Sequence, residues 1–151
     1  MLDRRSLILG LPCLLMAPNA LASIGISASP DLVRTAQTMR GSYEGSGRGT
    51  LHIVYTPWCS ASAAMHERTR NFLDRMRLHW IPFSGGQPEG RVGTERLLSS
   101  PTASVAASFV PMGTIPVLHE ETPIADAQDA LVERLETLII RDTGYGLVSP
   151  T

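Results

Sequence analysis

Residues 50–62, which read T-L-H-I-V-Y-T-P-W-C-S-A-S, decide the fold of this chain. Residues 50–56 are rich in β-branched and aromatic side chains, which predicts a strand. Pro57 ends that strand because proline cannot donate a ladder hydrogen bond. Apolar residues at helical spacing then follow over 60–77. We therefore expect Cys59 where a strand ends and a helix begins.

The rest of the chain predicts further elements around this unit. We expect helices over 30–40, 95–99, 102–110 and 127–141, and strands over 78–83, 115–119 and 122–125. Gly144 follows the last helix as a stop signal. Residues 84–94, with four glycines and a proline, are expected to be loop. Pro82 indicates that its strand ends there or lies at a sheet edge. The order predicts an α/β fold with a central mixed sheet of about four strands, flanked by helices.

The two faces of the first strand differ in character. Alternation along 50–56 predicts that Leu51, Ile53 and Tyr55 share one face, with His52 and Val54 on the other.

The first 22 residues have the layout of an export signal. Arg4 and Arg5 precede an apolar run over 7–16, and a small-residue pattern then ends at Ala22. We expect cleavage after Ala22. The paired arginines fit a twin-arginine signal and also occur in general secretory signals, so both routes stay open. An apolar run of ten residues is too short for a stable membrane anchor.

Export changes what the cysteines can do. The chain has two cysteines, and Cys13 would leave with the signal. Cys59 would then be the single thiol of the mature protein. A single thiol in an exported protein suggests either an intermolecular disulfide or a reactive cysteine. A helix N-terminus stabilises a thiolate, and Trp58 would shield one side of it. The alternative is an inert buried cysteine.

Composition and spacing argue against several other kinds of site. The net charge is −1 and no basic run is present, so we expect no nucleic-acid partner. Cysteine and histidine lack zinc-like spacing, so we expect no metal, and no cofactor is predicted. His66 is expected to be a solvated histidine on its helix.

Residues 54–67, V-Y-T-P-W-C-S-A-S-A-A-M-H-E, carry a resemblance to a known family. They are similar to the active-site region of bacterial periplasmic disulfide isomerases of the DsbC/DsbG family, whose catalytic domain has a thioredoxin-like fold. Residues 72–83 resemble that family's passage from helix to strand, and residues 113–118 match its cis-proline loop. The resemblance covers about residues 51–140.

This resemblance implies the domain organisation. The thioredoxin-like domain would occupy residues 50–143, after an N-terminal helix and flexible connector over 23–49. Residues 144–151 would form a tail. The family's N-terminal dimerisation domain has no counterpart here, because residues 23–49 are too short.

The resemblance also implies the site residues. Cys59 would be the catalytic thiol, with Ser62 where the family has its second cysteine. Trp58, Ile115 and Pro116 would bind substrate, and Pro116 would form the cis peptide bond. Ile115 departs from the threonine that the isomerases tend to have before this proline.

These residues predict a periplasmic protein that forms mixed disulfides with cysteine-containing exported clients, as an isomerase-like enzyme or a thiol escort. Ser62 cannot resolve such a complex, so release would need a client thiol, a small external thiol or a redox partner protein. The alternative is a non-catalytic binding or assembly module of a bacterial envelope complex. Its groove at Trp58, Ile115 and Pro116 would hold an extended peptide by backbone pairing.

Overall fold

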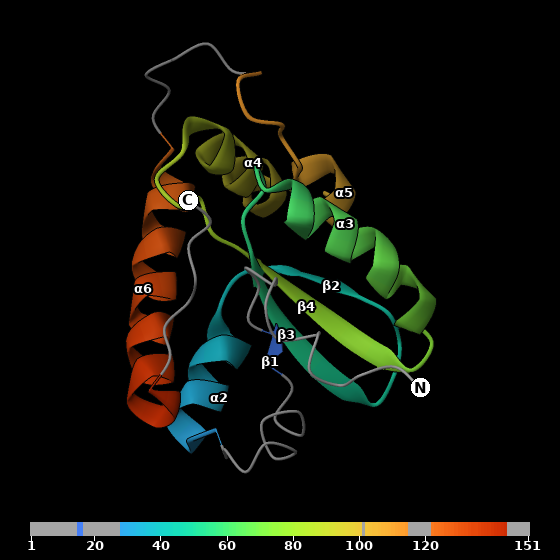
Figure 1. The fold of residues 1–151 in the computed structure, drawn as a ribbon, viewed down its shortest axis with the longest axis vertical. Coiled ribbons are helices and arrows are strands. Elements are labelled where there is room, and N and C mark those ends of the chain that lie inside the picture. Colours follow the sequence, from blue (N-terminus) through green and yellow to red (C-terminus); the bar gives the residue numbers. More distant parts are fainter. Residues whose placement is uncertain (1–14, 17–27, 101, 115–121, 145–151) are drawn as a thin grey trace, which may run out of the picture.

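The computed structural model describes residues 15–16, 28–100, 102–114 and 122–144 (Figure 1). The strands are β1 (Leu15–Met16), β2 (Ser42–Glu44), β3 (Gly49–Tyr55) and β4 (Met76–Pro82). The helices are α2 (Pro30–Thr38), α3 (Ser60–Thr69), α4 (Pro88–Ser99), α5 (Val105–Ser108) and α6 (Pro123–Thr143), with the 3₁₀-helix η1 (Arg70–Phe72) after α3.

The predicted mixed sheet with helices around it is confirmed. The strand order is β1-β3-β4-β2. β3 and β4 run parallel from the pair Gly49↔Met76 to the pair Tyr55↔Pro82, and α3 makes the crossover that a parallel pair needs. β2 is antiparallel to β4, and the two-residue β1 is antiparallel to β3. β1 lies within the residues that we expect to form the export signal.

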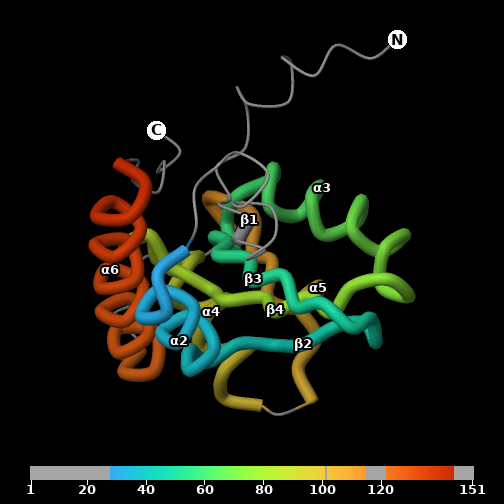
Figure 2. The backbone as a smooth tube through the Cα atoms, turned by 90° about the horizontal axis from the view of Figure 1, so that it is seen from below, coloured from blue at the N-terminus to red at the C-terminus, as the bar shows by residue number. Residues whose placement is uncertain are grey.

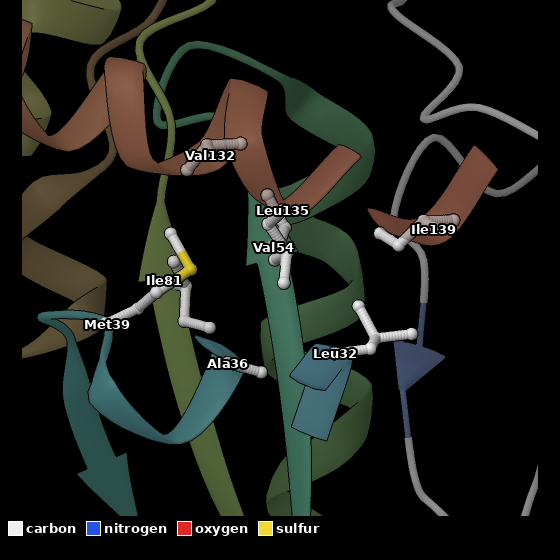
Figure 3. Close-up of a cluster of buried hydrophobic side chains, with 8 residues drawn as sticks. All are labelled: Leu32, Ala36, Met39, Val54, Ile81, Val132, Leu135 and Ile139. Carbon is white, nitrogen blue, oxygen red and sulfur yellow. The ribbon is translucent and has the colours of Figure 1, made fainter. Parts of the chain in front are cut away.

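Alternation along β3 divides the core into two clusters, as predicted. Val54 packs with Ile81 against α2 and α6, which lie side by side (Figures 2 and 3). On the other face, Leu51, Ile53 and Tyr55 pack with residues of β4, α4 and α5. The first cluster consists of Leu32, Ala36, Met39, Val54, Ile81, Val132, Leu135 and Ile139. The second consists of Leu51, Ile53, Tyr55, Leu78, Trp80, Leu97 and Val105. The sheet is thus buried on both faces.

The helix expected over 60–77 is shorter than predicted. α3 ends at Thr69, and β4 already begins at Met76. Asn71 and Asp74 favour local turns over helix, and the apolar residues beyond them belong to the strand. Pro82 is the last residue of β4, which confirms the prediction that the strand ends at this proline. β4 lies between β3 and β2, so the edge alternative is wrong.

A helix replaces most of the loop expected over 84–94. α4 begins at Pro88, because a proline is well suited to the first turn of a helix. Its glycines are sites of close packing. A Cβ at Gly90 would lie 2.1 Å from the Ser84 carbonyl oxygen, and one at Gly93 would lie 2.3 Å from that of Ser108. The short helix expected over 102–110 is confirmed only in its centre, as α5.

The predicted strand over 122–125 is wrong. Thr122 precedes α6, and Pro123 is its first residue, so the last helix starts before residue 127, where we expected it to begin. Gly144 ends α6 with φ 76°, as predicted. The strand expected over 115–119 lies outside the described residues. The connector expected before residue 50 contains β2 and is therefore in part a strand of the sheet.

Two buried histidines join the neighbouring strands β3 and β4. The Nδ1 atoms of His52 and His79 are 2.9 Å apart, so one donates a hydrogen bond to the other. The ring of Tyr43 on β2 stacks on His79 at 4.1 Å, and the Arg77 guanidinium lies 4.4 Å from the centre of the Tyr43 ring. Burial lowers the pKa of His52. Burial, followed by the charges of His52 and Arg77, lowers the pKa of His79 to about 4.

We expect this pair to make the fold sensitive to mild acid. Below the ordinary histidine pKa of 6.5 the unfolded chain binds protons that the buried imidazoles do not, so stability falls as the pH drops from 6.5 towards 4. Between about pH 7 and about pH 5 the free energy of unfolding should fall by about 1–2 kcal/mol. Urea unfolding over this range measures the slope. His79→Gln should reduce the slope, and an unchanged slope in that variant would contradict the assignment.

Candidate functional site

Cys59 lies at the predicted junction between strand and helix. The turn after β3 is closed by a hydrogen bond of 3.1 Å from the Cys59 amide to the Thr56 carbonyl. Cys59 is the N-cap residue of α3, and its own carbonyl accepts from the Ala63 amide at 3.2 Å. A backbone position at a helix N-cap places the side chain beside unpaired helical amides.

The Cys59 thiol is free and only 7% exposed. Its sulfur accepts no capping hydrogen bond from the first turn of α3. Ser62 lies on that same turn and is fully buried. The structure thus brings together the two predicted residues of the C-x-x-S pattern. A partner would have to make close contact with the surface around Cys59 in order to reach the thiol.

Trp58 directly precedes Cys59 in the chain, and its side chain is half-buried. Its indole Nε1 donates a hydrogen bond of 2.9 Å to the carbonyl of Ser84, in the loop after β4. The next residue, Gly85, has φ 63°, and a Cβ there would lie 3.4 Å from the indole nitrogen. Sequence reasoning placed Trp58 at the site but missed Ser84. The signal was the S-G-G sequence directly after a strand, which we interpreted only as loop.

The segment after α5 contacts the turn that carries Cys59 and is also bonded to α4. The Val110 amide donates to the Pro57 carbonyl at 3.0 Å. The carboxylate of Glu89, a buried residue in the first turn of α4, accepts from the Gly113 amide at 2.7 Å. Ile115 and Pro116, which the resemblance places opposite Cys59, lie outside the described residues.

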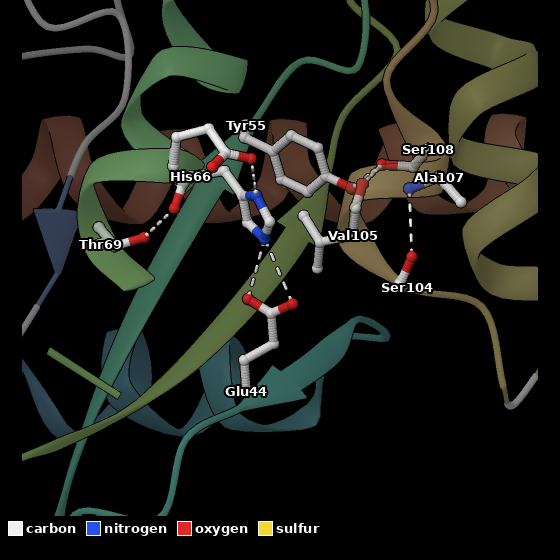
Figure 4. A network of polar contacts seen from close by, with 9 residues as sticks. Glu44, Tyr55, His66, Thr69, Ser104, Val105, Ala107 and Ser108 are labelled. Atoms are coloured by element: carbon white, nitrogen blue, oxygen red, sulfur yellow. Dashed lines mark hydrogen bonds and ion pairs between the residues drawn. The ribbon is translucent and has the colours of Figure 1, made fainter. Parts of the chain in front are cut away.

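Behind the site, Tyr55 has a structural role. Its hydroxyl is 2.7 Å from the Ser108 hydroxyl, which donates to the Val105 carbonyl at 2.6 Å (Figure 4). Burial raises the pKa of Tyr55 above its ordinary value, so the phenol stays neutral. These bonds attach α5 to the end of β3.

The expectation that His66 is solvated is wrong. Its side chain is 3% exposed, and Nε2 lies 3.0 Å from the Glu44 carboxylate on β2 (Figure 4). The imidazole also packs against Trp80, with ring centres 5.1 Å apart. Ser62 and His66 are four residues apart and both buried, so they share the inward face of α3. This contact between His66 and Glu44 fixes α3, and with it Cys59, to the sheet.

No cluster of three or more metal-ligating side chains occurs among the residues that the structure describes. In the same part of the chain, no helix is long and apolar enough to cross a membrane.

No protein-family model matches the chain, and no curated protein matches it.

The Glu44–His66 pair gives a stability prediction with an internal control. Glu44→Ala should lower the free energy of unfolding by about 1–3 kcal/mol, because it leaves a buried imidazole nitrogen without its acceptor. Glu67 also faces this imidazole, at 3.9 Å, but its side chain is 69% exposed. Glu67→Ala should cost less than about 0.5 kcal/mol. Urea unfolding compares the two variants, and equal losses would show that the buried contact does not fix α3.

Proposed function

We propose that this chain is an exported, thioredoxin-like thiol protein that forms mixed disulfides with client proteins through Cys59. The observation that carries the proposal is the position of Cys59. The only cysteine outside the expected signal is the N-cap residue of the helix that follows β3. The parallel β3–β4 pair with α3 as its crossover, buried on both faces by helices, supports a thioredoxin-like fold.

The start of α3 presents backbone amides to the position of Cys59. The first helical turn exposes amides that have no intrahelical acceptor and carries a partial positive charge. No acidic residue lies in the first turn of α3, so no carboxylate there opposes a negative sulfur. Reactive cysteines in thiol proteins commonly lie at helix N-termini.

The reaction is thiol–disulfide exchange. The Cys59 thiolate attacks one sulfur of a client disulfide, the client S–S bond breaks, and a bond forms between Cys59 and that sulfur. The other client sulfur leaves as a thiolate with the electron pair. If a client thiolate then attacks the sulfur joined to Cys59, a new client disulfide forms and Cys59 is released unchanged. The sum is isomerisation without net oxidation or reduction.

Ser62 determines how the complex is resolved. A hydroxyl cannot displace the client from Cys59, so the chain without its expected signal has no internal route to release. Release comes from a client thiol, a small external thiol or a redox partner protein. We infer a disulfide isomerase-like or thiol-escort role in the periplasm.

One observation favours a second candidate function. The Cys59 thiol is 7% exposed, which also suits a binding or assembly module whose cysteine has no chemical role. In that case the half-buried Trp58 would contribute apolar surface for an extended peptide. The two functions differ in whether the sulfur is needed.

Trapping tests whether the sulfur is needed. The chain with Cys13→Ser should form an adduct with a disulfide-linked peptide, visible by mass spectrometry without reductant, and should restore a scrambled disulfide substrate in the presence of a small thiol. Cys59→Ala should lose both properties. If the parent chain forms no adduct and restores no substrate, the thiol function fails. Unchanged function of Cys59→Ala in cells would support the binding module.

Ser62→Cys should convert the site to one that resolves its own complexes. The new thiol would attack Cys59, release the client in reduced form, and leave an intramolecular disulfide in the protein. The adduct lifetime should fall at least about tenfold, because an internal thiol replaces an external one. Ser60→Cys is the control, since it adds an exposed thiol on the same turn. Equal lifetimes for Ser62→Cys and the parent chain would contradict our view of Ser62.

A further inference from the structure

A chain of hydrogen bonds connects the indole of Trp58, the residue before Cys59, to helix α6. Trp58 Nε1 donates to the Ser84 carbonyl at 2.9 Å. The Ser84 amide donates to Oδ1 of Asp129 at 2.9 Å, and the Ser84 hydroxyl donates to Oδ2 of the same carboxylate. Asp129 lies on α6 and is 45 residues further along the chain than Ser84. Ser84 is therefore held on one side by a carboxylate and holds Trp58 on the other.

The loop after β4 is shaped for this contact. Gly85 and Gly86 have φ values of 63° and 75°, which side chains other than glycine rarely adopt. The Gly86 amide donates to the Ser84 hydroxyl at 3.0 Å, so that hydroxyl both accepts and donates. The absence of a side chain at Gly85 lets the loop backbone approach the indole of Trp58. This geometry brings the Ser84 carbonyl to the indole nitrogen.

The carboxylate is the part of this chain that is costly to lose. Ser84 is fully buried, so without Asp129 its amide would be a buried donor lacking its acceptor. Hydrogen bonds to an ionised carboxylate are stronger than those between neutral groups. Ser84 donates its amide hydrogen bond to Asp129 and accepts the indole hydrogen bond from Trp58 on its carbonyl. A shift of Ser84 would therefore also move the Trp58 indole.

We propose that Asp129 is a positioning residue that acts through Ser84 to set the orientation of the Trp58 indole at the Cys59 site. The indole then provides an apolar surface of fixed orientation, and the peptide around a client disulfide packs against that surface. This second step rests on the proposed function, whereas the link from Asp129 to Trp58 does not. Asp129 touches neither the thiol nor a client.

The chain has two tryptophans, which makes the link measurable. The full chain with Cys13→Ser should give two indole N–H signals in a ¹H–¹⁵N spectrum, and Trp58→Phe identifies one of them. In Asp129→Ala the Trp58 signal should move, and its hydrogen exchange should accelerate about five- to tenfold as the bond to Ser84 weakens. The Trp80 indole nitrogen is buried and has no acceptor among the described residues, so its signal should stay in place.

Asp126 supplies the matched control. It lies one turn before Asp129 on α6, and its carboxylate pairs with Arg91 at 2.8 Å. Asp126→Asn should leave the Trp58 signal unchanged. Ser84→Ala keeps the Ser84 amide and carbonyl but removes the hydroxyl, so it should move the signal less than Asp129→Ala does. Should Asp129→Ala not fold, Asp129→Asn and Ser84→Ala carry the same test.

A second experiment compares the rates at which Cys59 reacts with a large and with a small disulfide. The rate of adduct formation with a disulfide-linked peptide should fall about three- to tenfold in Asp129→Ala, because the peptide loses this surface of fixed orientation. The rate with oxidised glutathione, which is too small to need that surface, should stay within about twofold of the parent value. A structural defect at Cys59 would lower both rates together.

Each outcome separates the two proposals. An unmoved Trp58 signal in Asp129→Ala overturns the positioning role. A moved signal with an unchanged peptide rate overturns the link between indole orientation and client docking. If the parent chain forms no adduct at all while Asp129→Ala still moves the Trp58 signal, the thiol function fails and the positioning role of Asp129 stands.

Discussion

The parallel pairing of β3 with β4 is the constraint on which the rest of the structure depends. It places Tyr55 opposite Pro82, so both strands end at the same edge of the sheet. The Phe83 amide continues the pairing by donating to the Tyr55 carbonyl at 2.8 Å. The turn to Cys59 and the loop at Ser84 therefore leave the sheet side by side. The contact between Trp58 and Ser84 follows from this pairing, although the two residues are distant in sequence.

Polar groups buried within the sheet layer distinguish this core from a purely apolar one. The His52–His79 pair joins the two central strands, and the Glu44–His66 pair joins α3 to β2. Burying a nitrogen or a carboxylate without a partner costs free energy, so such pairs favour one register and one helix orientation. The same burial makes the histidine pair a point at which acid weakens the fold. Cys59 is thus held at the end of a helix whose inward face is fixed to the sheet by the contact between His66 and Glu44.

Local chemistry explains which elements could be predicted. The β-branched run before Pro57 identified β3, the alternation along it identified its two faces, and Gly144 marked the end of α6. The predictions failed where packing overrides propensity. The glycines near the start of α4 suggested loop, but Gly90 lies where the Ser84 carbonyl leaves no room for a side chain. The strand predicted over 122–125 likewise failed, because Pro123 is the first residue of a helix there.

The sequence by itself determined that Cys59 lies at a strand-to-helix junction, with Trp58 before it and Ser62 on the first helical turn. Those relations are local, since neighbours in the chain and the helical repeat fix them. Only the tertiary structure decided the burial of His66 and the roles of Ser84 and Asp129. Their partners lie 22 to 45 residues away, and the folding of the sheet and α6 brings them together. Spacing along the chain does not encode such contacts, because they depend on which faces pack against each other.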